Sequence, residues 1–207
     1  YIYYFNMTPL HKVLINKDTN IKPIWIMRQA GRYLPEFREI RKKNPNFINL
    51  CLNPILSSEI TLQPIRRFDF DAAIIFSDIL MLPYGLNQEI EFKKNFGPVL
   101  GEVNMKEMSK VDEIDFVEKI LPVYKAIEKV SKNNLMTNKN TIGFVGAPWT
   151  LLVYMINQQS PKKNLKKDFF KDDFLINRIL LILEKFLKIH IKNQVDSGAE
   201  VIQIFDS

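Results

Sequence analysis

The sequence has very little cysteine and histidine, and each shortage excludes a class of function. Cys51 is the only cysteine among 207 residues, so the chain can form neither an intramolecular disulfide nor a multi-cysteine metal site, which agrees with a reducing compartment. We expect Cys51 to be a small buried hydrophobic residue. The two histidines, His11 and His190, fall in no catalytic motif, and His190 stands between Ile189 and Ile191 in an apolar pattern. Both are interpreted as structural residues.

The sequence also lacks an apolar run long enough to cross a bilayer, and its opening residues YIYYFN do not resemble a signal peptide. Hydrophobic residues make up 46% and charged residues 25%, which is typical of a soluble globular protein. We therefore expect a cytoplasmic protein that does not bind membranes. The net charge of +6 comes mostly from scattered lysines, without a basic stripe interleaved with aromatic residues, so nucleic-acid binding is not expected.

Four short apolar runs, bounded by turn residues, are typical of buried parallel strands. They are Ile24 to Met27, Ala72 to Phe76, Ile142 to Gly146 and Val201 to Phe205. Helical patterns separate these runs, and the alternation predicts a parallel sheet with right-handed crossovers, either doubly wound or a (β/α) barrel. No glycine-rich phosphate-binding sequence follows the first run, which counts against a dinucleotide-binding fold.

Capping residues and hydrophobic periodicity predict where the helices lie. Thr8 followed by Pro9 is typical of a helix start, and Pro148 begins another. Amphipathic patterns predict three further helices, at Ser57 to Phe68, Asp112 to Lys132 and Asp172 to Ser197. Gly198 would end the last of these. Between the second and third strands, alternating residues in Glu89 to Leu100 predict a β-hairpin outside the main sheet.

The stretch Pro23 to Arg41 is the most informative, because a buried-strand signal leads directly into a set of arginines. Arg28 and Arg32 follow the apolar run, with Gly31 between them. Arginine is costly to desolvate, and its planar guanidinium binds a carboxylate through two parallel hydrogen bonds. This pattern indicates a site for a small molecule that carries several negative charges.

Small or polar residues follow all four predicted strands, at the edge where ligands bind in both candidate architectures. They are Arg28 after the first strand, Ser77 and Asp78 after the second, Gly146 to Pro148 after the third, and Asp206 and Ser207 after the fourth. The carboxylate of Asp78 can accept several N–H donors, and Tyr154 can point back toward the same edge. A substrate with several carboxylates around an N–H-bearing centre would satisfy this set.

Four strings in the chain resemble the uroporphyrinogen decarboxylase family. They are WIMRQAGRYLPEFREIR (Trp25 to Arg41), TLQPIRRFDFDAAIIFSDIL (Thr61 to Leu80), IGFVGAPWTLLVYM (Ile142 to Met155) and GAEVIQIFDS (Gly198 to Ser207). The resemblance implies an α/β fold, the (β/α)8 TIM barrel. It also implies a homodimeric carboxy-lyase of haem biosynthesis that removes carbon dioxide from the four acetate side chains of uroporphyrinogen III, giving coproporphyrinogen III without a metal or organic cofactor.

The same resemblance implies a set of site residues. Catalytic roles fall to Asp78, Arg28 and Arg32. Substrate contacts are implied for Arg28, Ala30, Arg32, Arg41, Asp78, Tyr154 and Ser207. An ionised Asp78 would bind the pyrrole N–H groups and stabilise the cation that forms when a ring is protonated before carbon dioxide leaves. The arginines would clamp carboxylates, and the group that donates the ring proton stays open.

The sequence departs from the family pattern in two places. Residues Ile156 to Pro161 stand where the family has a glycine-rich loop, and the sequence stops at Ser207 and begins without methionine. We therefore expect residues 1–207 to form a single incomplete TIM-barrel domain with roughly the first four β/α units. Alone, it would be inactive and either unstable or dependent on association. Two alternatives remain: a corrinoid or thiol methyltransferase of the same barrel superfamily, which would need a zinc site of His and Cys, and a non-catalytic tetrapyrrole-binding module.

Overall fold

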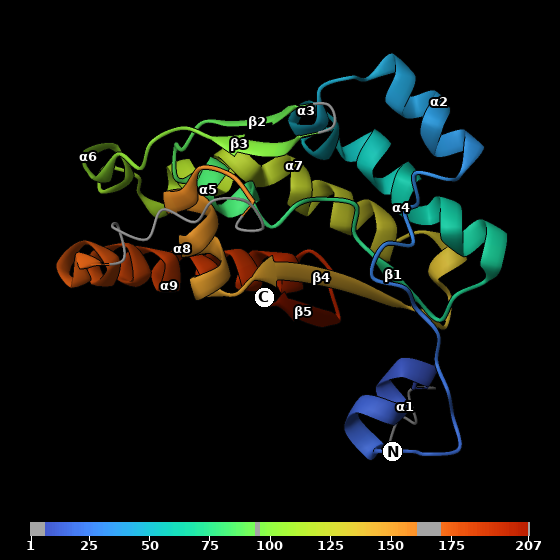
Figure 1. Ribbon diagram of the computed structural model, residues 1–207. Helices are drawn as coiled ribbons and strands as arrows, with labels where there is room; N and C mark the ends of the chain where they lie inside the picture. The colour runs from blue at the N-terminus through green and yellow to red at the C-terminus, as the bar shows by residue number, and fades with distance from the viewer. Residues whose placement is uncertain (1–6, 94–95, 161–170, 207) are drawn as a thin grey trace.

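A parallel three-stranded sheet forms the centre of the computed structural model, which describes residues 7–93, 96–160 and 171–206 (Figure 1). Its strands, in the spatial order β1-β4-β5, are β1 (Ala72–Ile74), β4 (Asn140–Gly146) and β5 (Val201–Phe205). Ile142 of β4 lies opposite both Ile74 of β1 and Val201 of β5. Three of the four predicted strands and their parallel arrangement are thus confirmed.

The remaining prediction, a strand over Ile24 to Met27, is wrong. No strand forms there, and three of its side chains are between 48% and 58% exposed. Just before β1, the N–H of Asp71 donates to the carbonyl of Ile24 (3.0 Å). The carbonyl of Ala72, the first residue of β1, instead accepts a hydrogen bond from the side-chain amide of Gln29 (3.0 Å). Residues Ile24 to Met27 therefore lie beside β1 without pairing as a strand, because the Gln29 side chain occupies the Ala72 carbonyl that a backbone hydrogen bond between strands would need.

The longer helices pack against the outer face of this sheet. They are α4 (Pro54–Phe68), α7 (Glu113–Ser131) and α9 (Asp173–Asp196), of which α4 and α7 lie above the sheet in the view of Figure 1. The last two of these helices each begin after a capping aspartate. Asp112 accepts the N–H of Asp115 (2.8 Å), and Asp172 accepts the N–H of Leu175 (2.9 Å). Gly198, just after α9, has a φ of 106°, a conformation that suits glycine.

On the other side of the sheet lies the short helix α1 (Pro9–Asn16), below the strands in Figure 1. It begins at the predicted cap, because the hydroxyl of Thr8 accepts the N–H of His11 (3.3 Å). The same hydroxyl donates to the side-chain oxygen of Asn140 at the start of β4. Leu10 packs against inward-facing residues of two strands, Ala72, Ile74 and Ile142. The helix therefore covers the amino-terminal end of the inner face.

Shorter elements complete the described structure. They are α2 (Pro35–Lys43), α3 (Phe47–Cys51), α5 (Met81–Gly85), α6 (Met105–Met108), the 3-10 helix η1 (Asn134–Met136) and α8 (Pro148–Asn157). Strands β2 (Ile90–Lys93) and β3 (Gly97–Leu100) pair antiparallel in a sheet of their own. The ring of Phe92 on β2 packs against the ring of Phe47, with centroids 4.5 Å apart. This contact joins the hairpin to α3.

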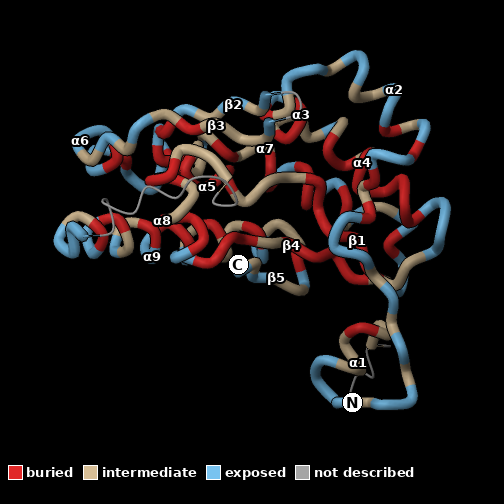
Figure 2. Tube along the Cα trace, viewed as in Figure 1, coloured by how far each residue is buried: buried red, intermediate tan, exposed pale blue. Residues whose placement is uncertain are grey.

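The core fills the layer between the sheet and the outer helices, where Figure 2 shows the buried segments. Cys51 is fully buried, as expected for a small hydrophobic residue. His190 is also buried, and its Nδ1 lies 2.9 Å from the hydroxyl of Tyr124, which supports a structural role. Among the described residues, no helix is both long enough and apolar enough to span a membrane.

Candidate functional site

Asp78 lies four residues beyond the end of β1, in the short connection to α5. Its carboxylate accepts the N–H of Leu80 (2.9 Å), and its carbonyl accepts the N–H of Met81 (3.1 Å). The residue is half-buried, and burial raises its pKa from 3.8 to about 6, although the hydrogen bond from Leu80 opposes this shift. The carboxylate is therefore mostly ionised at neutral pH, yet close to its titration range.

Arg28 and Arg32 lie on the loop that follows the segment beside β1, and both are exposed. Within the described parts of the chain, neither guanidinium makes a hydrogen bond or an ion pair. Gln29 between them is buried, and it ties the loop down through the N–H of Ile26 (3.1 Å) and the carbonyl of Ala72 (3.0 Å). Two cationic side chains are thus displayed to solvent from an anchored backbone.

Gly31 is buried beneath the ring of its neighbour Tyr33. A Cβ at this position would meet that ring, and because Tyr33 is 55% exposed, a side chain at position 31 would displace the ring. Gln29 could not be identified as the anchor from the sequence, because no local pattern marks an amide that bonds to a strand 43 residues away.

Arg41 differs from the other two arginines because it is partly buried. Its guanidinium donates to the carbonyl of Asn44 (2.5 Å) and lies 5.7 Å from the centre of the Phe47 ring. Cys51 lies near both Arg41 and Asp78. Burial raises the pKa of the Cys51 thiol well above its usual value, the carboxylate of Asp78 raises it further, and the guanidinium of Arg41 opposes the shift. Cys51 is therefore close enough to both Asp78 and Arg41 to feel the charge of each.

The other residues of the predicted set are placed as follows. Ala30 is partly buried against the core beneath α2 and α4. Tyr154 lies on α8, partly buried against the core between α7 and α9. One turn earlier on α8, the hydroxyl of Thr150 donates to the carboxylate of Asp206 (2.7 Å), so the start of this helix is tied to the end of β5. Ser207 lies outside the described residues.

No ion pair joins Asp78 to Arg28 or Arg32 among the described residues, and neither guanidinium affects the pKa of Asp78. A cavity of about 720 Å³ does occur in the structure, at the amino-terminal ends of β4 and β5 beside α1. It is lined by residues such as Thr8, Ser131 and Thr141 and by none of the predicted site residues. The described residues also contain no cluster of three or more His, Cys, Asp or Glu side chains that could hold a metal ion.

Comparison with known proteins identifies the family. The family model described as uroporphyrinogen decarboxylase (URO-D) matches residues 6–207. The chain belongs to the uroporphyrinogen decarboxylase family. It is 42% identical over 195 residues to the uroporphyrinogen decarboxylase of Rickettsia felis, covering 93% of this chain and 56% of that protein. It is 40% identical over 197 residues to that of Agrobacterium fabrum, covering 94% of this chain and 57% of that protein.

The chain thus spans little more than half the length of these URO-D relatives. Among solved structures, a methyltransferase from Methanosarcina mazei matches with a TM-score of 0.71 and 17% sequence identity. The match covers 96% of this chain and 58% of the methyltransferase. At this identity the likeness concerns the fold alone.

Proposed function

We propose that this chain forms the amino-terminal part of a uroporphyrinogen decarboxylase, a carboxy-lyase of haem biosynthesis that converts uroporphyrinogen III to coproporphyrinogen III. The proposal rests on the family match over residues 6–207. It is supported by two exposed arginines, Arg28 and Arg32, that have no partner in the described structure and follow the segment that lies beside β1. Carboxylates of the substrate would provide the missing partners.

Asp78 would act on the tetrapyrrole ring. An ionised carboxylate accepts hydrogen bonds only, so it suits the pyrrole N–H groups at the centre of the substrate. Protonation of a pyrrole gives a cation that accepts the electron pair left when the carbon–carboxylate bond breaks, and carbon dioxide departs. A fixed negative charge stabilises this cation more than the neutral ring, which lowers the barrier to the reaction. Arg28 and Arg32 would orient the carboxylates of the substrate.

The remaining predicted features belong to the same proposal. The three strands and their outer helices would be part of a (β/α)8 barrel, formed as one domain with the β2–β3 hairpin as an insertion. Ala30, Arg41, Tyr154 and Ser207 would complete the substrate pocket. The complete enzyme would be a cytoplasmic homodimer that needs no cofactor.

An anaerobic assay of the full-length protein with uroporphyrinogen III tests this function. We expect stepwise loss of four carboxyl groups, with the same rate in the presence and absence of a metal chelator. Absence of carboxyl loss, together with zinc bound by the full-length protein, would favour the methyltransferase alternative, which needs a zinc site. Tight binding of the tetrapyrrole without carboxyl loss would favour the non-catalytic module.

A further inference from the structure

The chain between β1 and Asp78 is held by side chains on α4. The N–H of Ile75 makes a backbone bond to Ile142 of β4 (3.0 Å). At the next residue, Phe76, both backbone polar groups turn to hydroxyls instead. The N–H of Phe76 donates to the hydroxyl of Thr61 (2.8 Å), and its carbonyl accepts the hydroxyl of Ser57 (2.6 Å). Two points of contact therefore fix this one residue.

The contacts form a closed and buried network. The hydroxyl of Thr61 also donates to the carbonyl of Ser57 (2.8 Å), so it is both donor and acceptor, and its orientation is determined. Ser57 is 1% exposed and Thr61 is not exposed at all. Water cannot replace a lost hydroxyl there without rearrangement, so removal of either one leaves a polar group of Phe76 unpaired.

Side-chain contacts of Phe76 and Asp78 also hold the chain between β1 and α5. The ring of Phe76 packs edge-on against the rings of Phe37 and Phe47, with centroids 5.8 and 5.7 Å apart. Two residues further on, the carboxylate of Asp78 is bonded to the N–H of Leu80. The position of the carboxylate thus depends on the backbone at Phe76 on one side and on the start of α5 on the other.

We propose that Ser57 and Thr61 are positioning residues that fix the carboxylate of Asp78 for the reaction by clamping the backbone of Phe76. This inference rests on the proposed decarboxylase function. The two hydroxyls do not touch the substrate; they act through the chain two residues away. Reaction rates fall steeply when a catalytic group is displaced by about 1 Å, so loss of the clamp lowers turnover while the arginine contacts keep substrate affinity.

The test compares neighbouring residues of α4 in the full-length protein. Thr61→Val and Ser57→Ala remove the clamp, and Thr61→Ser keeps a hydroxyl. Ser58→Ala is the control, because Ser58 is also buried but bonds only to Ile55 within its own helix (3.0 Å) among the described contacts. We expect kcat to fall about tenfold or more in Thr61→Val and Ser57→Ala with KM within about twofold of wild type. Thr61→Ser and Ser58→Ala should keep most of the activity.

A second readout follows the carboxyl group directly. The 13C signal of the Asp78 carboxyl, assigned with Asp78→Asn, reports its titration whether or not the protein turns over substrate. A loosened segment admits water, so the pKa of Asp78 should fall in Thr61→Val and stay unchanged in Ser58→Ala. The Cys51 thiol, whose pKa the carboxylate of Asp78 raises, and Arg41, which acts on the same thiol, are unchanged in all these variants.

The two hypotheses can fail separately. Absence of turnover in the wild-type protein would reject the decarboxylase, and the carboxyl titration would still show whether the clamp holds Asp78. The clamp is contradicted if Thr61→Val and Ser57→Ala match Ser58→Ala in kcat, KM and Asp78 titration. It is also contradicted if their activity falls only in proportion to the folded fraction.

Discussion

The carboxylate of Asp78 is partly buried and can accept hydrogen bonds from N–H groups. Its raised pKa, about 6, places the loss of its charge just below neutral pH. For full-length Asp78→Asn we predict a loss of turnover of roughly a hundredfold or more, because the neutral amide cannot stabilise the pyrrole cation. Wild-type kcat should itself decline as pH falls through about 6. Steady-state rates between pH 5 and 8 measure both effects, and a variant with near-normal turnover would remove Asp78 from the mechanism.

The same burial makes ionised Asp78 costly to the fold. Its pKa is higher in the folded state than the usual 3.8, so its contribution to stability is greatest below pH 4 and is lost as pH rises through about 6. Asp78→Asn should therefore raise the free energy of unfolding at pH 7.5, by at most about 3 kcal/mol, and by nothing at pH 3.5. Urea unfolding of the full-length protein at both pH values measures this, and an equal effect at the two would refute the assignment.

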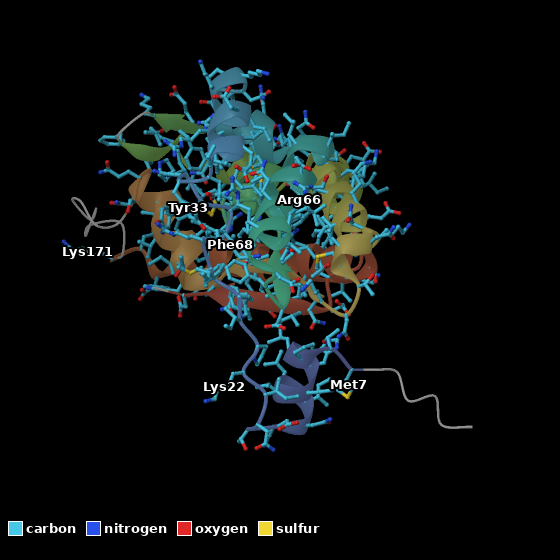
Figure 3. The ribbon with its side chains drawn as sticks, turned by 90° about the vertical axis from the view of Figure 1, so that its right-hand side faces the viewer. Met7, Lys22, Tyr33, Arg66, Phe68 and Lys171 are labelled. Carbon is cyan, nitrogen blue, oxygen red and sulfur yellow. The ribbon has the colours of Figure 1, made fainter. Side chains whose placement is uncertain are left out.

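The role of Arg28 depends on the geometry of its guanidinium, since lysine carries the same charge. We predict that Arg28→Lys raises the KM for uroporphyrinogen about tenfold and lowers kcat, because an ammonium group cannot make the two parallel bonds to a carboxylate. Arg66→Lys is the control. Arg66, labelled on α4 in Figure 3, is exposed. It is already paired with Glu59 through two bonds of 3.0 and 3.1 Å. Equal kinetic constants for Arg28→Lys and wild type would contradict the clamp.

At the scale of the elements, the loop that carries the arginines depends on one amide. We predict that Gln29→Leu lowers the free energy of unfolding by about 1–3 kcal/mol, because the polar groups of Ile26 and Ala72 lose their partner. The substitution should also raise KM, because the loop backbone that carries Arg28 and Arg32 would no longer be held in place. Lys22→Ala is the control, as Figure 3 shows Lys22 pointing away from the body of the protein. Unchanged stability and KM in Gln29→Leu would mean that the loop is held by other contacts.

Elements with local signals could be predicted from the sequence. The amphipathic patterns of Asp112 to Lys132 and Asp172 to Ser197 predict α7 and α9 to within a residue at each end. The apolar runs of β4 and β5 likewise indicate strands. The segment Ile24 to Met27 has the same kind of run but no strand, because pairing depends on a neighbouring backbone that local sequence does not reveal.

In the candidate site, too, residues with a local sequence signal could be predicted, and residues that act through distant contacts could not. Motif resemblance indicated Arg28, Arg32 and Asp78, whose roles remain predictions. It did not indicate Gln29, Ser57 or Thr61, whose bonds join residues 15 to 43 positions apart. Hydroxyls and amides of this kind are common in helices and loops, so only the folded arrangement shows which of them hold the backbone near a site.

At the scale of the whole molecule, the three-stranded sheet has a partly open side. All five residues of β5 are partly or fully exposed, and Ile204 is 55% exposed, although parallel sheets are usually covered on both faces. We predict that the isolated chain of 207 residues associates in solution and shows no decarboxylase activity. Light scattering and the anaerobic assay on the purified chain measure this, and an active monomer would disprove it.

The proposed function requires that Arg28, Arg32 and Asp78 bind one tetrapyrrole molecule. A crystal structure of the full-length protein with coproporphyrinogen bound tests this arrangement most directly. We expect the carboxylate of Asp78 at roughly 2.7–3.2 Å from pyrrole nitrogens, and both guanidinium groups against carboxylates of the same molecule. Product bound elsewhere, or Asp78 and the two arginines opening onto separate surfaces, would contradict it.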